Sequence, residues 1–81
     1  MKIQKAKLDK LVEMTRDYHN GDLKRLSEKN QKRMSFSVKE FGSLGCALFG
    51  MMGDIIGRIA PEASNEDICK VMEVLGHEVT E

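Results

Sequence analysis

The chain has 81 residues, which allows one domain spanning residues 1–81 and excludes a two-domain enzyme and most cofactor-binding folds. Hydrophobic residues make up 41% and charged residues 32%, with one proline, so the composition is neither collagen-like nor low-complexity nor disordered. Thirteen Lys and Arg balance thirteen Asp and Glu, giving a formal net charge of zero with neutral histidines.

The N-terminus carries no secretory signal, because residues 1–7 read MKIQKAK and have no apolar stretch after their charges. The two cysteines, Cys46 and Cys69, are too few for the disulfide framework of a small secreted domain. Both lie in apolar segments, and buried free thiols fit a reducing compartment, although one bridge between them stays an alternative. We therefore expect a cytoplasmic protein.

The first predicted helix spans residues 3–19, and the second spans residues 22–34. Between them, Gly21 can close the first helix in a left-handed conformation and Asp22 can cap the second. A helix running through Gly21 would cost only about 1 kcal/mol relative to Ala. The sequence thus leaves open whether residues 3–34 form one bent helix or two. The apolar face of the first helix has helical spacing and consists of Leu8, Leu11, Val12, Thr15 and Tyr18.

A capping box predicts the start of a third helix. Ser37 is the expected N-cap and Glu40 stands three residues later, while Phe36 and Phe41 have the spacing of a hydrophobic staple. The third helix should run from residue 37 to 59 and end before Pro61, because the residue before a proline avoids helical geometry.

A last helix is expected over residues 65–79. Ser64 is its predicted cap, and Glu66 and Asp67 complement the helix dipole in the first turn. No segment alternates with the period of a strand. The predicted fold is all-α, a small three- to four-helix bundle with the Gly-rich third helix at its centre. The predicted core is Leu8, Leu11, Val12, Tyr18, Leu26, Phe36, Phe41, Leu44, Leu48, Met52, Ile55, Ile59, Ile68, Val71, Met72 and Leu75.

The third helix is rich in glycine, each of which costs about 1 kcal/mol relative to Ala in a helix. A stripe of small side chains along it would let another helix backbone come close. That neighbour is either a helix of the same chain or a second subunit. A membrane span is disfavoured by two internal charges. The stripe consists of Gly42, Cys46, Gly50, Gly53, Gly57 and Ala60.

The two charges in this helix, Asp54 and Arg58, are spaced i, i+4. They form either a solvent-facing ion pair or a pair that contacts a partner. Because the helix is apolar on nearly every side, we expect the protein to be a homo-oligomer that joins subunits along the small-residue stripe, with this charge pair at the interface.

Residue patterns typical of catalysis or metal binding are missing. His19, His77 and the two cysteines lack the short paired spacings of zinc sites. The glycines are not followed by the Gly-Lys-Ser/Thr of a phosphate loop. The sequence shows no Ser-His-Asp or Cys-His arrangement typical of nucleophilic catalysis. We therefore expect no enzyme activity, no metal and no cofactor.

The charges divide along the chain. Residues 1–33 hold ten Lys and Arg against five Asp and Glu, a balance of +5, and residues 34–81 hold three against eight, a balance of −5. The first half includes a basic run that is either a solvated face or a surface for nucleic acid or an acidic protein. This predicted basic patch consists of Lys24, Arg25, Lys29, Lys32 and Arg33.

The leading hypothesis for function is a small protein-binding regulator, an inhibitor or an adaptor, that is not an enzyme and acts as a helical homo-oligomer. An alternative is nucleic-acid binding by the basic patch of residues 24–33. A further alternative is binding of a small anionic ligand, such as a nucleotide, at an oligomer seam lined by glycine backbone and Arg58 or Arg16.

Overall fold

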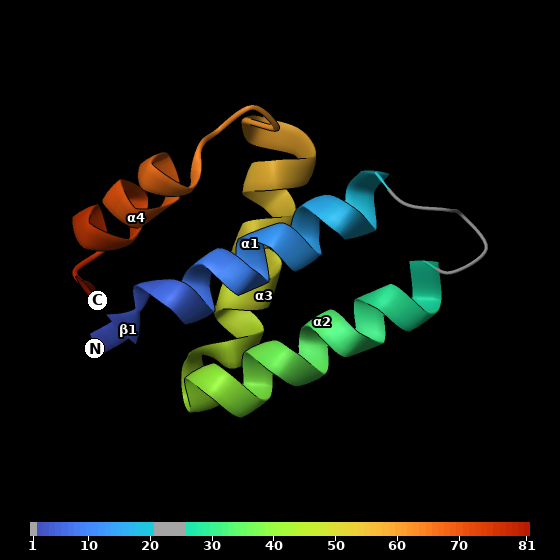
Figure 1. Ribbon diagram of the computed structural model, residues 1–81, viewed down its shortest axis with the longest axis horizontal. Helices are drawn as coiled ribbons and strands as arrows, with labels where there is room; N and C mark the ends of the chain where they lie inside the picture. Colours follow the sequence, from blue (N-terminus) through green and yellow to red (C-terminus); the bar gives the residue numbers. More distant parts are fainter. Residues whose placement is uncertain (1, 21–25) are drawn as a thin grey trace.

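The computed structural model describes residues 2–20 and 26–81, and it is mostly helical (Figure 1). The predicted all-α class is correct for the helices but omits a short sheet at the chain ends. In chain order the elements are β1 (Lys2–Gln4), α1 (Lys5–Asn20), α2 (Leu26–Phe41), the 3₁₀ turn η2 (Gly42–Leu44), α3 (Gly45–Asp54), the π-helical turn η3 (Ile55–Ile59), α4 (Asn65–Val74) and β2 (Glu78–Thr80).

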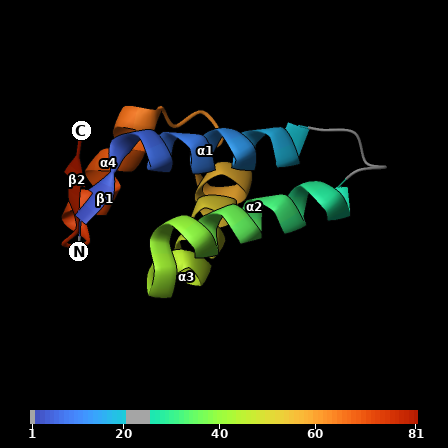
Figure 2. The ribbon, with the colours of Figure 1, turned by 60° about the horizontal axis from the view of Figure 1, so that its bottom comes forward.

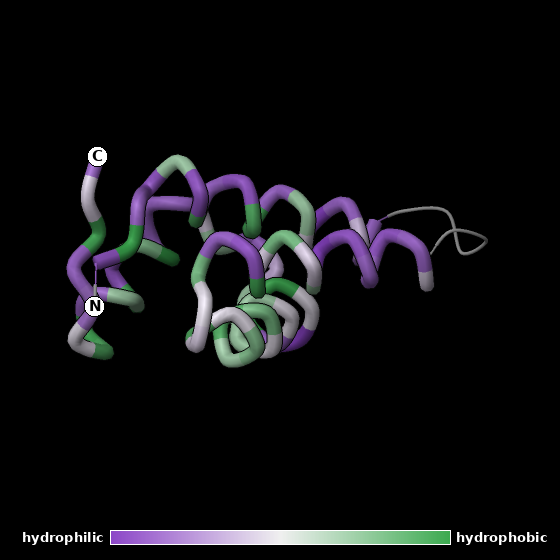
Figure 3. Tube along the Cα trace, turned by 90° about the horizontal axis from the view of Figure 1, so that it is seen from below, coloured by the Kyte–Doolittle hydropathy of each residue, from purple (hydrophilic) through white to green (hydrophobic). Residues whose placement is uncertain are grey.

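Helix α1 is the element on which the others pack. It contacts α2, α3, η3 and α4, and α4 packs mainly on α1 and on β2 (Figures 1 and 2). Its predicted inner face is confirmed, because Leu8, Leu11, Val12 and Thr15 are all buried. The prediction of a central Gly-rich helix is not confirmed: α3, seen nearly end-on and mostly hydrophobic in Figure 3, lies to one side against α1 and α2.

Helices α1 and α2 are separate and run in opposite directions, side by side (Figure 1). The predicted cap residues between them, Gly21 and Asp22, lie outside the described residues. The predicted second helix over 22–34 extends further, because α2 ends at Phe41, while its expected start lies outside the described residues.

The predicted helix start at Ser37 is wrong. Ser37 lies inside α2, fully buried, and its hydroxyl donates a 2.6 Å hydrogen bond to the carbonyl oxygen of Gly45. Glu40 forms no capping box and instead pairs with Lys7 at 2.8 Å. The chain turns at Gly42, whose φ of +58° favours glycine. Ser37 and Glu40, which the local spacing assigned to a helix cap, therefore make contacts with other elements instead.

Residues 42–59 form a continuous helical run whose geometry changes from 3₁₀ to α to π. The run ends at Ile59, before Pro61, as predicted. The Ala60 N–H donates to the carbonyl oxygen of Ile55 over 2.8 Å, the five-residue spacing of a π turn. Ile56 continues the i, i+4 spacing of the buried Leu48 and Met52 and is 4% exposed, whereas Ile59, predicted to be core, lies at the end of the π turn and is 69% exposed.

The last helix begins as predicted and ends early. The Ser64 hydroxyl accepts from the Asp67 N–H and the Asp67 carboxylate accepts from the Ser64 N–H, a complete capping box. Gly76, with φ of +94°, follows the end of the helix, so the predicted helix over 65–79 is corrected to Asn65–Val74. Strand β2 then pairs in parallel with β1, joining the two chain ends (Figure 2).

The core agrees with the prediction at eight buried positions and differs at its edges. Ile59, Val71 and Leu75 were predicted to be core and are exposed, Tyr18 is half-buried, and the side chain of Leu26 lies outside the described part. Phe36, Leu44 and Ile55 are partly buried against the core. The core side chains are Ile3, Leu8, Leu11, Val12, Phe41, Leu48, Met52, Ile56, Ile68, Cys69 and Met72.

Candidate functional site

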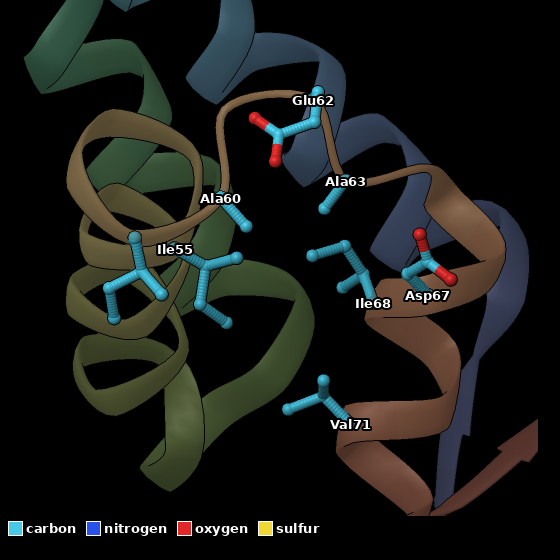
Figure 4. Close-up of a pocket in the computed structure, with 8 residues that line it drawn as sticks. Ile55, Ala60, Glu62, Ala63, Asp67, Ile68 and Val71 are labelled. Atoms are coloured by element: carbon cyan, nitrogen blue, oxygen red, sulfur yellow. The ribbon is translucent and has the colours of Figure 1, made fainter.

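An apolar groove of about 500 Å³ lies between η3 and α4 (Figure 4). Ile55 and Ile59 of η3 form one wall, and Ile68 and Val71 of α4 form the other. The turn that joins η3 to α4 closes one end with Ala60 and with the residues that follow it. The complete lining is Ile55, Ile59, Ala60, Glu62, Ala63, Asp67, Ile68 and Val71.

The groove exists because η3 and α4 each pack on α1 rather than on each other. The connecting turn is held by a hydrogen bond of 3.0 Å from the Ala63 N–H to the carbonyl oxygen of Ala60. Arg16 of α1 donates to the Ala63 carbonyl oxygen and, at 3.3 Å, to Oδ1 of Asn65. These bonds fix the separation of the two helical segments.

Exposed aliphatic side chains continue the groove along α4. Asp67, Val71 and Val74 follow one another at i, i+4 and i+7, so they share a helical face. Val74 is 86% exposed, and the neighbouring Leu75 is also exposed. With Ile59 on the opposite wall, these residues account for four of the five large hydrophobic side chains found exposed in the described part of the chain. Such clustering is typical of an interaction surface.

The closed end of the groove is acidic. Glu62 and Asp67 line it, and Glu66 lies on the same first turn of α4. Hydrogen bonds from the backbone N–H and the side chain of Ser64 lower the pKa of Asp67, so this carboxylate stays ionised near neutral pH. Within residues 2–20 and 26–81, none of the three acids forms a salt bridge.

The small-residue stripe predicted to join subunits is divided in the structure. Gly53 lies against Arg33 and Gly57 lies against the ring of His19, both within the same chain. Gly42 and Gly50 have open space beside them, and Cys46 is exposed. Among the described glycines, only Gly45 lies against the backbone of another helix, at Ser37 and Val38. Self-association along the stripe stays a prediction.

The Asp54 and Arg58 side chains do pair, with 3.6 Å between the carboxylate and the guanidinium Nε, and both are exposed. The pair lies on the solvent side of α3 and η3. Its contact with a partner stays a prediction.

The basic patch is dispersed in the structure. Lys24 and Arg25 lie outside the described residues. Lys29 pairs with Asp17 at 3.2 Å, and Lys32 pairs with Glu28 at 3.3 Å. The remaining cation, Arg33, is 4% exposed and faces the core.

Arg33 joins the first three helices. Its guanidinium donates to Thr15 Oγ1 at 3.1 Å, to the Phe49 carbonyl oxygen at 3.2 Å and to Asn30 Oδ1 at 3.1 Å. It also stacks on the ring of Phe49, 3.9 Å from the centroid, while Tyr18 lies 5.2 Å away. Burial lowers the pKa of Arg33, an effect that Tyr18 partly opposes. The side chain therefore acts in packing rather than as a surface cation.

A second, polar pocket lies where α1 and η3 end, and it contains Arg16, His19 and Gly57. Arg16 already donates to the carbonyl oxygen of Ala63 in the turn between η3 and α4, so this pocket adds little to the anionic-ligand hypothesis. The other cation named for that hypothesis, Arg58, is paired with Asp54.

Cys46 and Cys69 are both free, but only Cys69 is buried, contrary to the expectation of two buried thiols. Burial raises the pKa of Cys69. Across the described residues no three His, Cys, Asp or Glu side chains gather as a metal site would require. None of the described helices combines the length and the apolar character of a membrane span.

Comparison of the chain with protein-family models, curated proteins and solved structures finds no match. The groove was missed at the sequence level because Ile59, Val71 and Leu75 were assigned to the core. The available signal was the break at Pro61 followed by the cap at Ser64, which together predict a turn between two apolar helices.

Proposed function

We propose that the chain is a non-enzymatic protein-binding module, acting as an inhibitor or adaptor, that holds an amphipathic helix of another protein in the groove between η3 and α4. The observation that carries the proposal is the pair of aliphatic walls, Ile55 with Ile59 and Ile68 with Val71, facing a space of about 500 Å³ that the chain itself leaves unfilled.

The occupant that fits best is a helix. Both walls are helical, and a helix laid between two others packs its side-chain ridges into their grooves, as in a bundle. Helix-in-groove recognition uses apolar anchors at i, i+3 or i+4, and i+7. A partner with this spacing would complete the layer on α1 that η3 and α4 leave incomplete.

The exposed aliphatic side chains can supply enough free energy of burial for reversible binding of a partner. Burying an exposed aliphatic side chain contributes about 1.5–3 kcal/mol, and Ile59, Val71 and Val74 each offer such a surface. Association entropy and side-chain ordering oppose part of this gain, so an affinity in the micromolar range is expected.

The test is a binding titration with a designed helical peptide that has aliphatic anchors at helical spacing and a neutral Gln-rich outer face. Ile59→Glu and Val71→Glu place a charge on opposite walls, and each should weaken binding at least about tenfold, since an unpaired charge would be desolvated. The matched control is Val38→Glu, an exposed valine on α2, which should leave the affinity within about twofold. Equal losses in all three variants, or no binding by the wild type, would contradict the proposal.

Nucleic-acid binding by the basic patch has less support, because Arg33 is buried and the described lysines of the patch are already paired.

A further inference from the structure

We infer that the partner helix is basic, with Lys or Arg in the turn that meets the closed end of the groove, and that it belongs to a different protein rather than to a second copy of this chain. This inference rests on the proposed function and adds the chemistry of the partner.

The distribution of charge around the groove favours a basic partner. The walls of the groove are aliphatic, whereas its closed end carries the carboxylates of Glu62 and Asp67 (Figure 4). An apolar partner with acidic flanks would bring like charges together at this end. A basic turn would instead meet opposite charges, which favours one partner class and also one orientation in the groove.

Arg16, which donates to the Ala63 carbonyl oxygen, Lys70 on α4 and the N-terminus of α4 offset part of this negative charge. A helix N-terminus is equivalent to about half a positive charge, and Asp67 already interacts with it through the capping box with Ser64. Glu62 precedes the helix and forms no hydrogen bond or salt bridge among the described residues, so its charge is available at the rim.

A second copy of this chain fits the groove less well than a different protein. The described basic residues of this chain lie mainly on α1 and α2, and the apolar face of α1 is already buried in its own core. A second copy could not offer α1 to the groove without unfolding. A symmetric contact between two grooves would join identical surfaces, each with the same acidic rim, and so gains no opposite charge.

The test uses a peptide series with identical aliphatic anchors and with Lys, Gln or Glu at the outer positions near one end. At low ionic strength the Lys peptide should bind about threefold or more tighter than the Gln peptide, and the Glu peptide should bind more weakly than both. Added salt should reduce the difference between Lys and Gln, because rim charges are screened.

Two substitutions test whether the preference for the Lys peptide arises from the acids at the closed end of the groove. Glu62→Gln and Asp67→Asn should each reduce the ratio of the affinity for the Lys peptide to the affinity for the Gln peptide, measured with the same variant. Asn at position 67 retains an oxygen that can accept from Ser64. The matched control is Glu13→Gln, an exposed charge change on α1, which should leave the preference intact.

The outcomes separate this inference from the proposed function. If the Gln peptide binds and the Lys peptide binds no tighter, the proposed function stands and the inference fails. If no peptide binds, the proposed function fails first. A light-scattering mass above that of one chain for the protein alone, reduced by Ile59→Glu, would show that a second copy occupies the groove and would overturn the inference.

Discussion

The Ser37 hydroxyl donates a 2.6 Å hydrogen bond to the carbonyl oxygen of Gly45, across a close contact between α2 and α3. A Cβ atom added at Gly45 would lie 2.5 Å from the Cα atom of Val38 and 2.7 Å from the Ser37 carbonyl oxygen. The two helices can approach this closely only because one residue lacks a side chain and the other has a small one. The bond also satisfies a buried hydroxyl that would otherwise lack a partner.

Gly45→Ala should therefore destabilise the protein by about 1–3 kcal/mol, because the neighbouring atoms are backbone and cannot move aside. The measurement is the free energy of unfolding in urea. Gly50→Ala is the matched control: it lies in the same helix with open space beside it, and should stabilise by up to about 1 kcal/mol through helix propensity. Stabilisation by both substitutions would refute the close packing of α3 on α2.

The π-helical turn is tested by two isoleucines three residues apart. Ile56→Ala should cost about 2–5 kcal/mol, since Ile56 is buried among core side chains. Ile59→Ala should change the free energy of unfolding by about 0.5 kcal/mol or less, because that side chain is mostly exposed. Thermal or urea unfolding of both variants decides the register, and the reverse ranking would place Ile59 in the core.

Arg33→Lys should lower stability by about 1–3 kcal/mol even though it conserves charge. An ammonium group cannot reproduce the fork that reaches Thr15, Asn30 and Phe49, nor the stack on the Phe49 ring. Lys32→Met, next in sequence and exposed with its partner Glu28, should have an effect of about 0.5 kcal/mol or less. Chemical denaturation of the two variants tests this, and similar small effects would show that Arg33 is not a packing residue.

Stability should fall in acid in part through the Lys7–Glu40 pair. The hydrogen bond from Lys7 lowers the pKa of Glu40 below its ordinary value of 4.5. The contribution is then fully present above 4.5 and is lost as the pH falls through the lower pKa of the folded state. Unfolding curves of wild type and Glu40→Gln should differ at neutral pH and converge in acid. A difference that stays constant over this range would contradict the assignment.

The features of the fold that the sequence predicts correctly are those that depend on residues close together in the chain. The inner face of α1, the capping box at Ser64 and the stop before Pro61 depend on residues close in sequence, and all are confirmed. The cap predicted at Ser37 had equally good local spacing, yet Ser37 bonds Gly45 and Glu40 pairs with Lys7. Local spacing alone does not reveal such competing partners.

The groove was harder to predict for two physical reasons. Ile59 follows the buried Ile56 by three residues and lies at the end of the π turn, where it is exposed, and a regular helical period does not anticipate this. The β1–β2 pair joins residues more than seventy positions apart in sequence, and its three-residue strands show no alternating pattern long enough to recognise. Helix α4 ends early because the chain continues into β2. The aliphatic side chains of Val71 and Val74 on α4 stay exposed.

The most direct test of the account is an isotope-filtered NOE measurement on the labelled protein with the Lys peptide bound. The account predicts NOEs from the peptide's aliphatic anchors to the methyl groups of Ile55, Ile59 and Val71, with the basic turn of the peptide nearest Ala63 beside Glu62 and Asp67. NOEs that instead involve Val38 on α2, or that are absent from the groove methyls while the peptide is bound, would contradict it.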